Sequence, residues 1–571
     1  MTQALTISCA ERVLDAYRRI AEADRPEVWI TLRPETDVLA EARELDRRIA
    51  AGAELPLAGT LVAVKDNIDV ADLPTTAACP GFAYTPATSA PAVQRLVDAG
   101  ALVLGKTNLD QFATGLVGVR SPYGPVRNAL RPEKISGGSS SGSAVAVALG
   151  IADIALGTDT AGSGRVPAAL NDIVGLKPTL GLVPTTGVVP AARSYDAVTV
   201  FARTLTEAQR ALAVMIGPDG GDPLGRTWPD DVRLSAPEHP RVAVPGDDDL
   251  TPLSPEARAA FRTAVKRLEA AGAETTVIDV SPLLEAARLL YDGALVAERY
   301  AAVGEFIAGD PSAADPTVAG IILASGELPA HALAADQERL DGYKALARRL
   351  LAGYDALLLP TTTEHPDIAA VQADPVTVNS RLGTYTNFVN LLDLAAVAVP
   401  AGEADGGPFG VSVITRAFED QPALDIAALL TGEQAPTPLP GTGVDLAVFG
   451  AHLRGQPLNH QLSDSGARYA GEVTTSTAYR LTALTTEPPK PGLVRLGPGA
   501  GGPIAGERWT LSPAALGRFL AALPSPMSLG RIELADGSWV LGFQCDPHTA
   551  STGTDITHHG DWRSYLASSA S

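Results

Sequence analysis

Cysteine and long apolar runs are scarce in this chain of 571 residues. Its three cysteines, Cys9, Cys79 and Cys545, are odd in number and widely spaced. This pattern excludes a disulfide framework and the paired spacing of zinc or redox sites, so reduced thiols in the cytoplasm are the simplest interpretation. Charges interrupt residues 1–19 and no window of about 18 apolar residues follows. We therefore expect neither an N-terminal export signal nor a membrane span.

Basic residues are also in short supply. The chain has 44 Lys and Arg against 65 Asp and Glu, which gives a net charge of −21. A chain of this charge repels phosphate, which argues against nucleic acid and anionic membranes as partners. Glycine and proline number 55 and 45, below the share that is typical of low-complexity proteins. The chain is long enough to fold around hydrophobic cores without disulfide or metal staples.

The hydrophobic pattern predicts an α/β domain over residues 1–430. Residues 1–59 read as a helical part, with helices at 10–23 and 34–51 that we expect to pack outside the core. From Thr60 onward, short β-branched runs alternate with helical stretches, as in an α/β sheet.

Two later signals predict helix starts. Ser254 followed by Pro255 predicts a helix to about Ala271, and Ser281 followed by Pro282 predicts another long helix.

A linker and a second domain are expected after residue 430. Residues 431–444 (TGEQAPTPLPGTGV) have three prolines at alternate positions, the composition of an extended linker. Residues 445–571 contain nine basic and ten acidic residues, five of the eight histidines and three of the five tryptophans. Their short strands and turns predict a separate, small α+β domain.

Lys65 is a candidate general base. None of the eight histidines precedes His239, so no nearby histidine can serve the first third of the chain. Lys65 ends the apolar run 61–64, and burial there would lower the pKa of its ammonium and supply a neutral amine. The alternative is a lysine whose ammonium reaches solvent beyond the strand end.

Two loops rich in glycine and serine follow. Residues 137–143 (GGSSSGS) precede an apolar helix at 144–149, and residues 157–167 (GTDTAGSGRVP) follow a strand at 151–156. Such loops can aim backbone amides at an anion or an oxyanion. Each loop alone also fits a phosphate cradle or a plain turn. The first lacks the Gly-Lys-Ser/Thr ending of a nucleotide-binding loop.

Taken together and in this order, Lys65, the two loops and Gly175-Leu-Lys-Pro-Thr179 resemble the amidase signature family. The resemblance is strong from Thr60 to Arg203 and more diffuse to about residue 430. Ser163 follows Ser139 by 24 residues, the family's spacing between its two catalytic serines. The resemblance implies an α/β fold in which helices cover a mixed central sheet.

The resemblance also implies a mechanism without metal or cofactor. Ser163 is the nucleophile, Ser139 is a bridging serine after a cis peptide bond, and Lys65 is the base. Neutral Lys65 takes a proton from Ser139, which takes one from Ser163 as that serine attacks an amide carbonyl. The oxyanion hole is expected from the backbone amides of Thr160, Ala161, Gly162 and Ser163.

A later segment, residues 290–300, resembles the one with which allophanate hydrolases hold a substrate carboxylate. Tyr291 and Arg299 lie eight residues apart, so on one helix both can border one cavity. Arginine gives a two-pronged contact to a carboxylate and tyrosine adds a hydroxyl. The alternative is a solvated arginine that pairs with Glu298 or Glu285.

The tail resembles the same family, because residues 448–462 look like its C-terminal domain. His460, in an Asn-His-Gln context, is the candidate for a second site there, and His452 is its alternative. A structural histidine in a small core explains either residue equally well.

The two features together favour an allophanate hydrolase, an amidohydrolase acting on a linear amide. Allophanate is urea with a carboxylate on one nitrogen, and hydrolysis of its terminal amide gives ammonia and N-carboxycarbamate, which decarboxylates. The alternatives are another small-amide amidase, one component of a glutamine-dependent amidotransferase, and a non-catalytic binder on the same fold. The resemblance implies a homodimer. A separate urea carboxylase is expected upstream if urea, rather than an s-triazine breakdown product, supplies allophanate.

Overall fold

The computed structural model describes residues 7–434, 437, 439 and 443–569. It divides into two compact units, Met1–Thr227 with His239–Thr437, and Trp228–Glu238 with Pro438–Ser571. Residues 228–238 therefore group with the second unit, although the sequence places them inside the first predicted domain. Much of the predicted linker, residues 435–436, 438 and 440–442, lies outside the described residues. The linker and the domain boundaries 1–430 and 445–571 stay predictions.

The first unit is a mixed α/β structure. Its strands are β1 (Trp29–Leu32), β2 (Leu61–Lys65), β3 (Leu102–Thr107), β4 (Ile154–Asp159), β5 (Val174–Lys177), β6 (Ala197–Ala202), β7 (Arg241–Pro245), β8 (Glu274–Ile278), β9 (Ala356–Pro360), β10 (Leu394–Ala404) and β11 (Gly407–Arg416). Its helices are α1 (Cys9–Ala23), α2 (Glu35–Ala50), α3 (Pro91–Asp98), α4 (Ser141–Ala148), α5 (Val166–Leu170), α6 (Leu205–Met215), α7 (Pro255–Ala270), α8 (Ser281–Arg288), α9 (Ala297–Gly309), α10 (Pro316–Ser325), α11 (Ala330–Leu350), α12 (Ile368–Ala373), α13 (Thr377–Leu382), α14 (Asn387–Leu391) and α15 (Asp420–Thr431).

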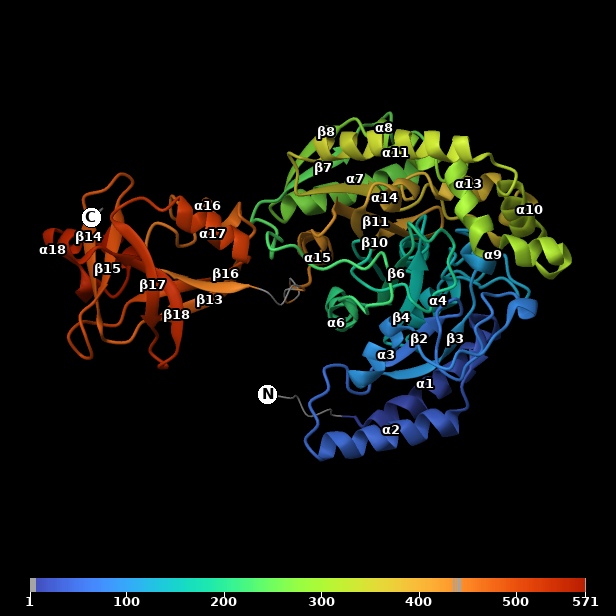
Figure 1. Cartoon of the computed structure of the whole chain (residues 1–571), viewed down its shortest axis with the longest axis horizontal. Coiled ribbons are helices and arrows are strands. Elements are labelled where there is room, and N and C mark those ends of the chain that lie inside the picture. Colours follow the sequence, from blue (N-terminus) through green and yellow to red (C-terminus); the bar gives the residue numbers. More distant parts are fainter. Residues whose placement is uncertain (1–6, 435–436, 438, 440–442, 570–571) are drawn as a thin grey trace. The chain divides into compact units, whose positions relative to one another are not determined.

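One sheet of eleven strands organises this unit, in the order β1-β3-β2-β4-β6-β5-β10-β11-β9-β7-β8. The pairs of β2 with β3 and β4, and of β7 with β8 and β9, are parallel. The edge pair β1–β3 is antiparallel, as are all pairs along the order β4-β6-β5-β10-β11-β9. Helices pack on it, for example α15 on β10 and β11. Figure 1 shows α1 and α2 below the strands β2 and β3. The predicted mixed sheet covered by helices is confirmed.

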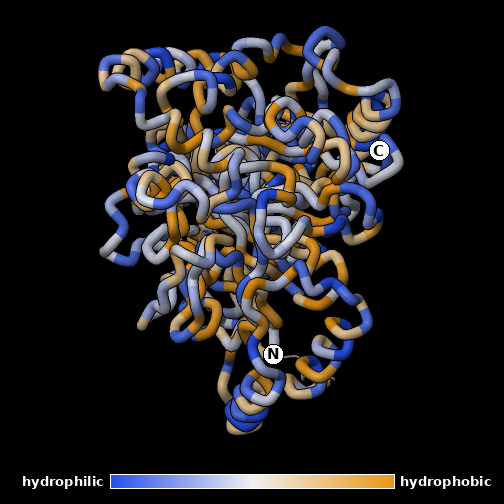
Figure 2. Tube along the Cα trace, turned by 90° about the vertical axis from the view of Figure 1, so that its right-hand side faces the viewer, coloured by the Kyte–Doolittle hydropathy of each residue, from blue (hydrophilic) through white to orange (hydrophobic). Residues whose placement is uncertain are grey.

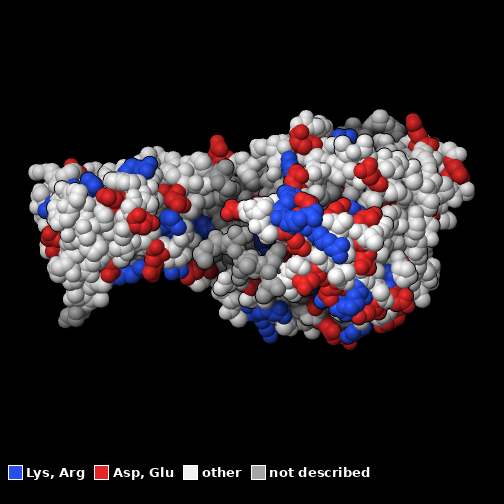
Figure 3. Space-filling view, turned by 90° about the horizontal axis from the view of Figure 1, so that it is seen from below, with Lys and Arg blue, Asp and Glu red and all other residues white. Residues whose placement is uncertain are grey.

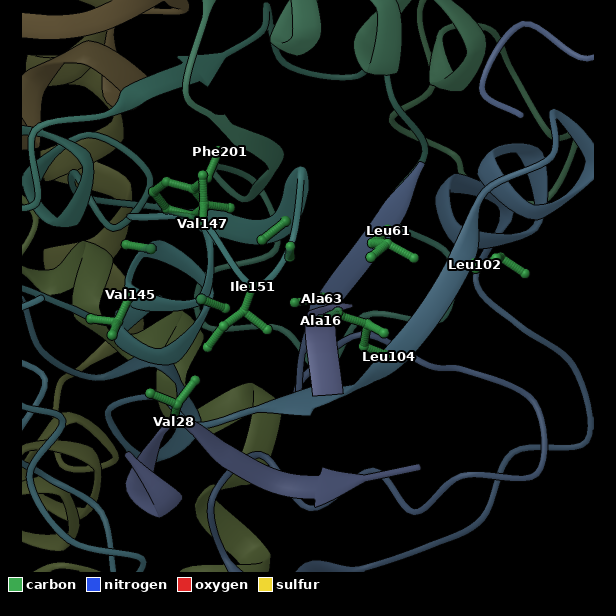
Figure 4. Packing of buried hydrophobic residues seen from close by; sticks show 14 of the residues in the cluster. Ala16, Val28, Leu61, Ala63, Leu102, Leu104, Val145, Val147, Ile151 and Phe201 are labelled. Carbon is green, nitrogen blue, oxygen red and sulfur yellow. The ribbon is translucent and has the colours of Figure 1, made fainter. Parts of the chain in front are cut away.

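The N-terminal part differs from its prediction in two ways. The strand β1 separates the two helices and pairs antiparallel with β3. Both helices also contribute to a buried cluster with the β2–β3 region, and Figure 4 shows Ala16 of α1 among these side chains. The trace near the N-terminus in Figure 2 changes repeatedly between hydrophilic and hydrophobic residues. Such amphipathic helices bury one face, so they complete the core rather than lie outside it.

The helix predicted at Ser281 is shorter than expected. It ends at Arg288, and the chain turns before a short 3-10 helix η4 (Ala294–Val296) and α9. Gly293 marks the break, because a Cβ there would lie 2.6 Å from Asp336 Oδ2 and 2.8 Å from Leu289 O. Asp336 of α11 also accepts a hydrogen bond from the amide of Ala294 at 2.6 Å. This tertiary contact therefore fixes the chain at the start of η4, beyond the end of α8. The helix predicted from Ser254 matches α7, with Ser254 as its N-cap.

The second unit has two smaller sheets. Five strands form the order β13-β16-β12-β18-β17 and three form β15-β14-β19. The strands are β12 (Val444–Val448), β13 (Arg468–Thr474), β14 (Tyr479–Leu484), β15 (Lys490–Arg495), β16 (Ala505–Leu511), β17 (Met527–Glu533), β18 (Trp539–Cys545) and β19 (Thr554–Asp555). The helices are α16 (His460–Ser463), α17 (Pro513–Ala521), α18 (Pro547–Thr552) and α19 (Trp562–Ser569). This matches the predicted small α+β fold.

Acidic and basic side chains are interspersed on the face drawn in Figure 3. Over the described residues, no one helix has both the length and the apolar composition to cross a membrane; a bent pair, α10 with α11 at 94°, meets those two criteria jointly.

Candidate active site

Lys65 is fully buried at the end of β2 and contacts two hydroxyls. Its Nζ lies 2.7 Å from Ser139 Oγ and 2.8 Å from Thr158 Oγ1. The structure therefore brings the predicted base directly to the predicted bridging serine. The parallel pairing of β2 with β4 explains the second contact, because it places the ends of both strands at the same edge of the sheet.

Ser139 follows a cis peptide bond from Gly138. A Cβ at Gly138 would collide with Asp110 Oδ2, so only glycine fits at position 138. Gly137 has a φ of +73°, a conformation that favours glycine. Asp110 fixes the backbone of the loop that follows it. Its carboxylate accepts hydrogen bonds from the backbone amides of Val117, Gly118 and Arg120.

Ser163 lies in the loop between β4 and α5 and is 3% exposed. Asp159 organises this loop, because its two carboxylate oxygens accept the amides of Gly162 and Gly164, each at 2.9 Å. Arg165 forms a buried ion pair with the same carboxylate at 2.9 Å. These contacts lower the pKa of Asp159 despite its burial. Among the described residues, the hydrogen bonds do not include one between the hydroxyls of Ser139 and Ser163.

The predicted oxyanion hole changes in one respect. The amide of Gly162 donates to Asp159 and is not directed at a substrate. In the described chain, the amides of Thr160, Ala161 and Ser163 have no hydrogen-bond partner. Gly162 instead provides space, since its φ is +130° and a Cβ would collide with Thr386. The loop is thus shaped by a carboxylate beneath it, which the sequence motif does not specify.

The electrostatic setting of Lys65 favours its neutral form. Burial lowers its pKa from 10.5 to about 7, although the carboxylates of Asp110, Asp196 and Asp159 oppose this shift. The guanidinium of Arg299 adds to the lowering, which indicates that Arg299 lies in the same region. A lysine with a pKa near neutrality can exchange a proton at physiological pH.

Arg299 is buried, 2% exposed, and its two terminal nitrogens are held by neutral groups. One donates to Thr114 Oγ1 at 2.8 Å and the other to the Tyr291 hydroxyl at 2.9 Å. Its Nε is buried and has no hydrogen-bond partner among the described residues. The suggested pairing with Glu298 or Glu285 is not what the structure has, because Glu298 accepts the amide of Ser194 and Glu285 contacts Tyr343.

Tyr291 and Arg299 meet, but not from one helix as predicted. Tyr291 lies in the turn after α8, whereas Arg299 lies in α9. The guanidinium also sits 5.2 Å from the centre of the Tyr291 ring. A buried cation that pairs with no carboxylate in the described part of the chain suits an anionic group of a ligand.

Thr114, Thr158 and Asn67 were not among the residues predicted from sequence. Asn67 Nδ2 lies 3.2 Å from Thr158 Oγ1. Thr158 stands inside the GTDTAGS motif, two residues before Thr160. Side chains of a strand point alternately to opposite faces, so this alternation could have distinguished Thr158 from the residues on either side of it. Thr114 follows two residues of positive φ, Phe112 and Ala113, and no sequence signal marks it.

The second unit contains a cavity of about 600 Å³. Its walls are mostly apolar, with polar side chains from His452, His460, Lys490 and Arg518 among them. His460 is exposed and its Nδ1 lies 2.9 Å from Pro457 O. His452 is buried, stacks on Phe543 at 4.7 Å and contacts Gln461 at 3.0 Å, and burial lowers its pKa. In the parts of the chain that the structure describes, no three His, Cys, Asp or Glu side chains are grouped to hold a metal ion.

Comparison with known proteins adds relatives for both units. The chain is 42% identical to a urea amidolyase of Saccharomyces cerevisiae over 97% of its own length and 32% of that protein. It is 36% identical to a component of the glutamyl-tRNA(Gln) amidotransferase of Symbiobacterium thermophilum, over 74% of this chain and 92% of the relative. The chain thus spans about a third of the length of the urea amidolyases that it matches.

A solved structure of Kluyveromyces lactis allophanate hydrolase superposes with a TM-score of 0.87 and 39% identity, over 99% of this chain and 97% of the other. The family model described as Amidase matches residues 11–424, and that described as Allophanate hydrolase C-terminal domain matches residues 444–567. The chain therefore belongs to the amidase family, and its amidase domain is followed by an allophanate hydrolase C-terminal domain.

Proposed function

We propose that this protein hydrolyses the terminal amide of allophanate to ammonia and N-carboxycarbamate. The observation that carries the proposal is the contact at 2.7 Å between Lys65 Nζ and Ser139 Oγ, together with the buried guanidinium of Arg299, which acts electrostatically on Lys65 and forms no ion pair with a described carboxylate. The Lys65–Ser139 contact provides a general base for amide hydrolysis, and the guanidinium of Arg299 binds an anionic substrate. Likeness to allophanate hydrolase and to urea amidolyases supports the same substrate.

The reaction begins at Ser163. Neutral Lys65 accepts the proton of Ser139, and Ser139 accepts the proton of Ser163 as the Ser163 oxygen bonds to the carbonyl carbon. The negative oxygen that forms is stabilised by the amides of Thr160, Ala161 and Ser163. The proton returns through the same relay to the leaving nitrogen, which departs as ammonia. Water then attacks the acyl-enzyme by the same route and releases N-carboxycarbamate.

Arg299 orients the substrate in this scheme. Its buried Nε has no hydrogen-bond partner among the described residues, and its terminal nitrogens contact the hydroxyls of Tyr291 and Thr114. We infer that charge-assisted hydrogen bonds from this guanidinium fix the carboxylate of allophanate. The reacting carbonyl is then presented to Ser163. An uncharged amide would lack this anchor, so we infer that the carboxylate sets specificity.

The second unit offers a site for the following step. N-carboxycarbamate loses carbon dioxide to give carbamate, which breaks down to a second ammonia and a second carbon dioxide. We infer that the cavity beside His460 receives N-carboxycarbamate, because it combines apolar walls with the cations Lys490 and Arg518. Apolar surroundings favour loss of a carboxylate as neutral carbon dioxide, because the charge is poorly solvated there.

Glutamine-dependent amidotransfer is the second candidate function. It is favoured by the amidotransferase relatives, one of which is 36% identical to this chain over 74% of its length. However, that relative aligns with only 74% of this chain although 92% of its own length is covered. The additional C-terminal domain therefore favours allophanate over glutamine.

The wider setting follows from the same proposal. A urea carboxylase, either on a separate chain or within a longer polypeptide as the urea amidolyase relatives suggest, would supply allophanate. We also infer a homodimer in the cytoplasm, and the three buried, unpaired cysteines fit a reducing compartment. Size-exclusion chromatography with light scattering tests the dimer.

The deciding experiment measures ammonia release by purified protein from allophanate, biuret, malonamide and glutamine in parallel. Allophanate should give the largest kcat/KM by a wide margin. Preference for glutamine would favour amidotransfer, and equal activity on all four would remove the role of Arg299 in specificity.

A further inference from the structure

The hydroxyl of Thr158 stands between the predicted base and an amide side chain. Lys65 Nζ lies 2.8 Å from Thr158 Oγ1, and Asn67 Nδ2 lies 3.2 Å from the same oxygen. All three residues are at most 2% exposed. The catalytic scheme above uses Ser139 and Ser163 and gives Thr158 and Asn67 no part.

The orientation of the Asn67 amide is determined by a second contact. Its Nδ2 also lies 3.2 Å from the carbonyl oxygen of Val189, which can only accept hydrogen bonds. The amide nitrogen must therefore face Val189, because the reversed amide would set two oxygens against each other. The backbone amide of Val189 donates in return to the backbone carbonyl oxygen of Asn67 at 2.8 Å. Asn67 thus donates one N–H to Thr158 from a fixed position.

This arrangement restricts what the threonine can do. A hydroxyl oxygen has two lone pairs. The Asn67 N–H takes one of them, and the other is left for an N–H of Lys65. The neutral amine of Lys65 has a single lone pair, and it acts as a base only if that pair points at Ser139. A second partner on the far side of the nitrogen is therefore needed to orient it.

We propose that Thr158, held by Asn67, is a positioning residue that directs the lone pair of Lys65 toward Ser139 Oγ. When Lys65 takes up the proton of Ser139, Thr158 remains an acceptor for the ammonium that forms. No atom of Thr158 needs to touch substrate. The inference rests on the proposed function, because it assumes that Lys65 is the base.

Other charged groups also act on Lys65 and must be kept constant in a test. The carboxylates of Asp110, Asp196 and Asp159 raise its pKa, and Arg299 lowers it. They lie outside the Asn67–Thr158 contact, so a substitution of Thr158 by valine leaves all four in place. Valine has the shape of threonine and lacks the acceptor oxygen.

The test is the pH profile of kcat and KM for Thr158→Val with allophanate. We expect kcat to fall about 10- to 100-fold with KM unchanged, since the base is misdirected but the substrate site is intact. The acid limb of the profile should also move down by about half to one pH unit. The reason is that an acceptor stabilises the ammonium more than the amine, so its loss lowers the pKa of Lys65.

Three further variants make the result decisive. Thr158→Ser keeps the hydroxyl and should restore the acid limb and most of kcat. Thr361→Val is the matched control, since it removes a buried threonine hydroxyl that contacts Ser412, at 2.9 Å, on a different part of the sheet. Asn67→Ala should lower kcat less than Thr158→Val. Thr158→Ala replaces the valine variant if that protein does not fold.

The outcomes separate this inference from the proposed function. If Lys65→Ala retains activity, the base assignment fails and this inference falls with it. If Lys65→Ala is inactive while Thr158→Val behaves as Thr361→Val does, only the inference is overturned. A fall in kcat with an unmoved acid limb, or no recovery in Thr158→Ser, also overturns it, because a general packing defect would give those results.

Discussion

The surroundings of Lys65 and the cavity beside His460 are built in opposite ways. Lys65, Ser139 and Thr158 are buried at an edge of the large sheet, and the loops around them are tied by buried carboxylates. His460 is exposed at the wall of a cavity of about 600 Å³ with largely apolar lining. The first region holds a few polar atoms in fixed positions, whereas the second offers space and charge.

This difference indicates how much each region depends on geometry. A proton relay requires its atoms to be placed within fractions of an ångström, so polar side chains are held by buried hydrogen bonds. Loss of carbon dioxide needs mainly desolvation and a cation, which a loosely lined cavity can supply. Substitutions should therefore have large effects around Lys65 and small ones around His460.

Removal of the Ser163 hydroxyl should have the largest effect. Ser163→Ala is expected to lower kcat for allophanate at least about 1000-fold, because no other group can form the acyl-enzyme. Ammonia release measures it, and thermal unfolding should show an unchanged fold. Activity close to that of the unchanged protein would remove the nucleophile assignment.

Truncation of Arg299 should come next. Arg299→Ala is expected to lower kcat/KM for allophanate by roughly 100-fold, since it removes charge-assisted hydrogen bonds to the carboxylate. The internal control is malonamide, which carries no carboxylate and should be affected little. An equal loss on both substrates would indicate a structural role instead.

Acidification should inactivate the enzyme through Lys65. Burial lowers its pKa to about 7, so below that pH the amine becomes protonated and cannot accept the proton of Ser139. kcat/KM should fall about tenfold for each pH unit below 7, which a pH–rate profile measures. A profile that stays flat down to pH 5 would contradict a neutral lysine as base.

The smallest effect is expected from His460→Ala. Release of the first ammonia should change less than about twofold, because this histidine belongs to the second unit and takes no part in the relay. Release of the second ammonia and of carbon dioxide should lag behind the first. Time courses of both products measure the lag, and simultaneous release would show that His460 has no part in decarboxylation.

The sequence predicted a large part of the fold. Strand β2 and helix α7 form close to where apolar runs and a Ser-Pro start placed them, because these signals are local. The strand β1 was missed because it has only four residues between two strongly periodic helices. Its assignment depends on pairing with β3, which lies about 70 residues later.

The site was predictable to a similar degree. The contact of Lys65 with Ser139 follows the motif order, whereas the Tyr291 and Arg299 geometry depends on the break between α8 and α9, where Asp336 of α11 accepts the amide of Ala294. The motif also did not predict that the Gly162 amide donates a hydrogen bond to Asp159. These features arise from contacts between residues far apart in sequence or from the shape of a loop, and neither leaves a periodic signal.

By itself, the sequence determined which chemistry is available, since it supplies a lysine at the end of the apolar run 61–64, two serines in glycine-rich loops and an arginine in a later segment. Only the tertiary structure decided how these groups act. Parallel pairing of β2 and β4 placed Thr158 against Lys65, and the packing of α9 gave Arg299 neutral partners and an unpaired Nε. The physical reason is that pKa values, lone-pair directions and free donors depend on burial and on neighbours in space, which only the folded chain defines.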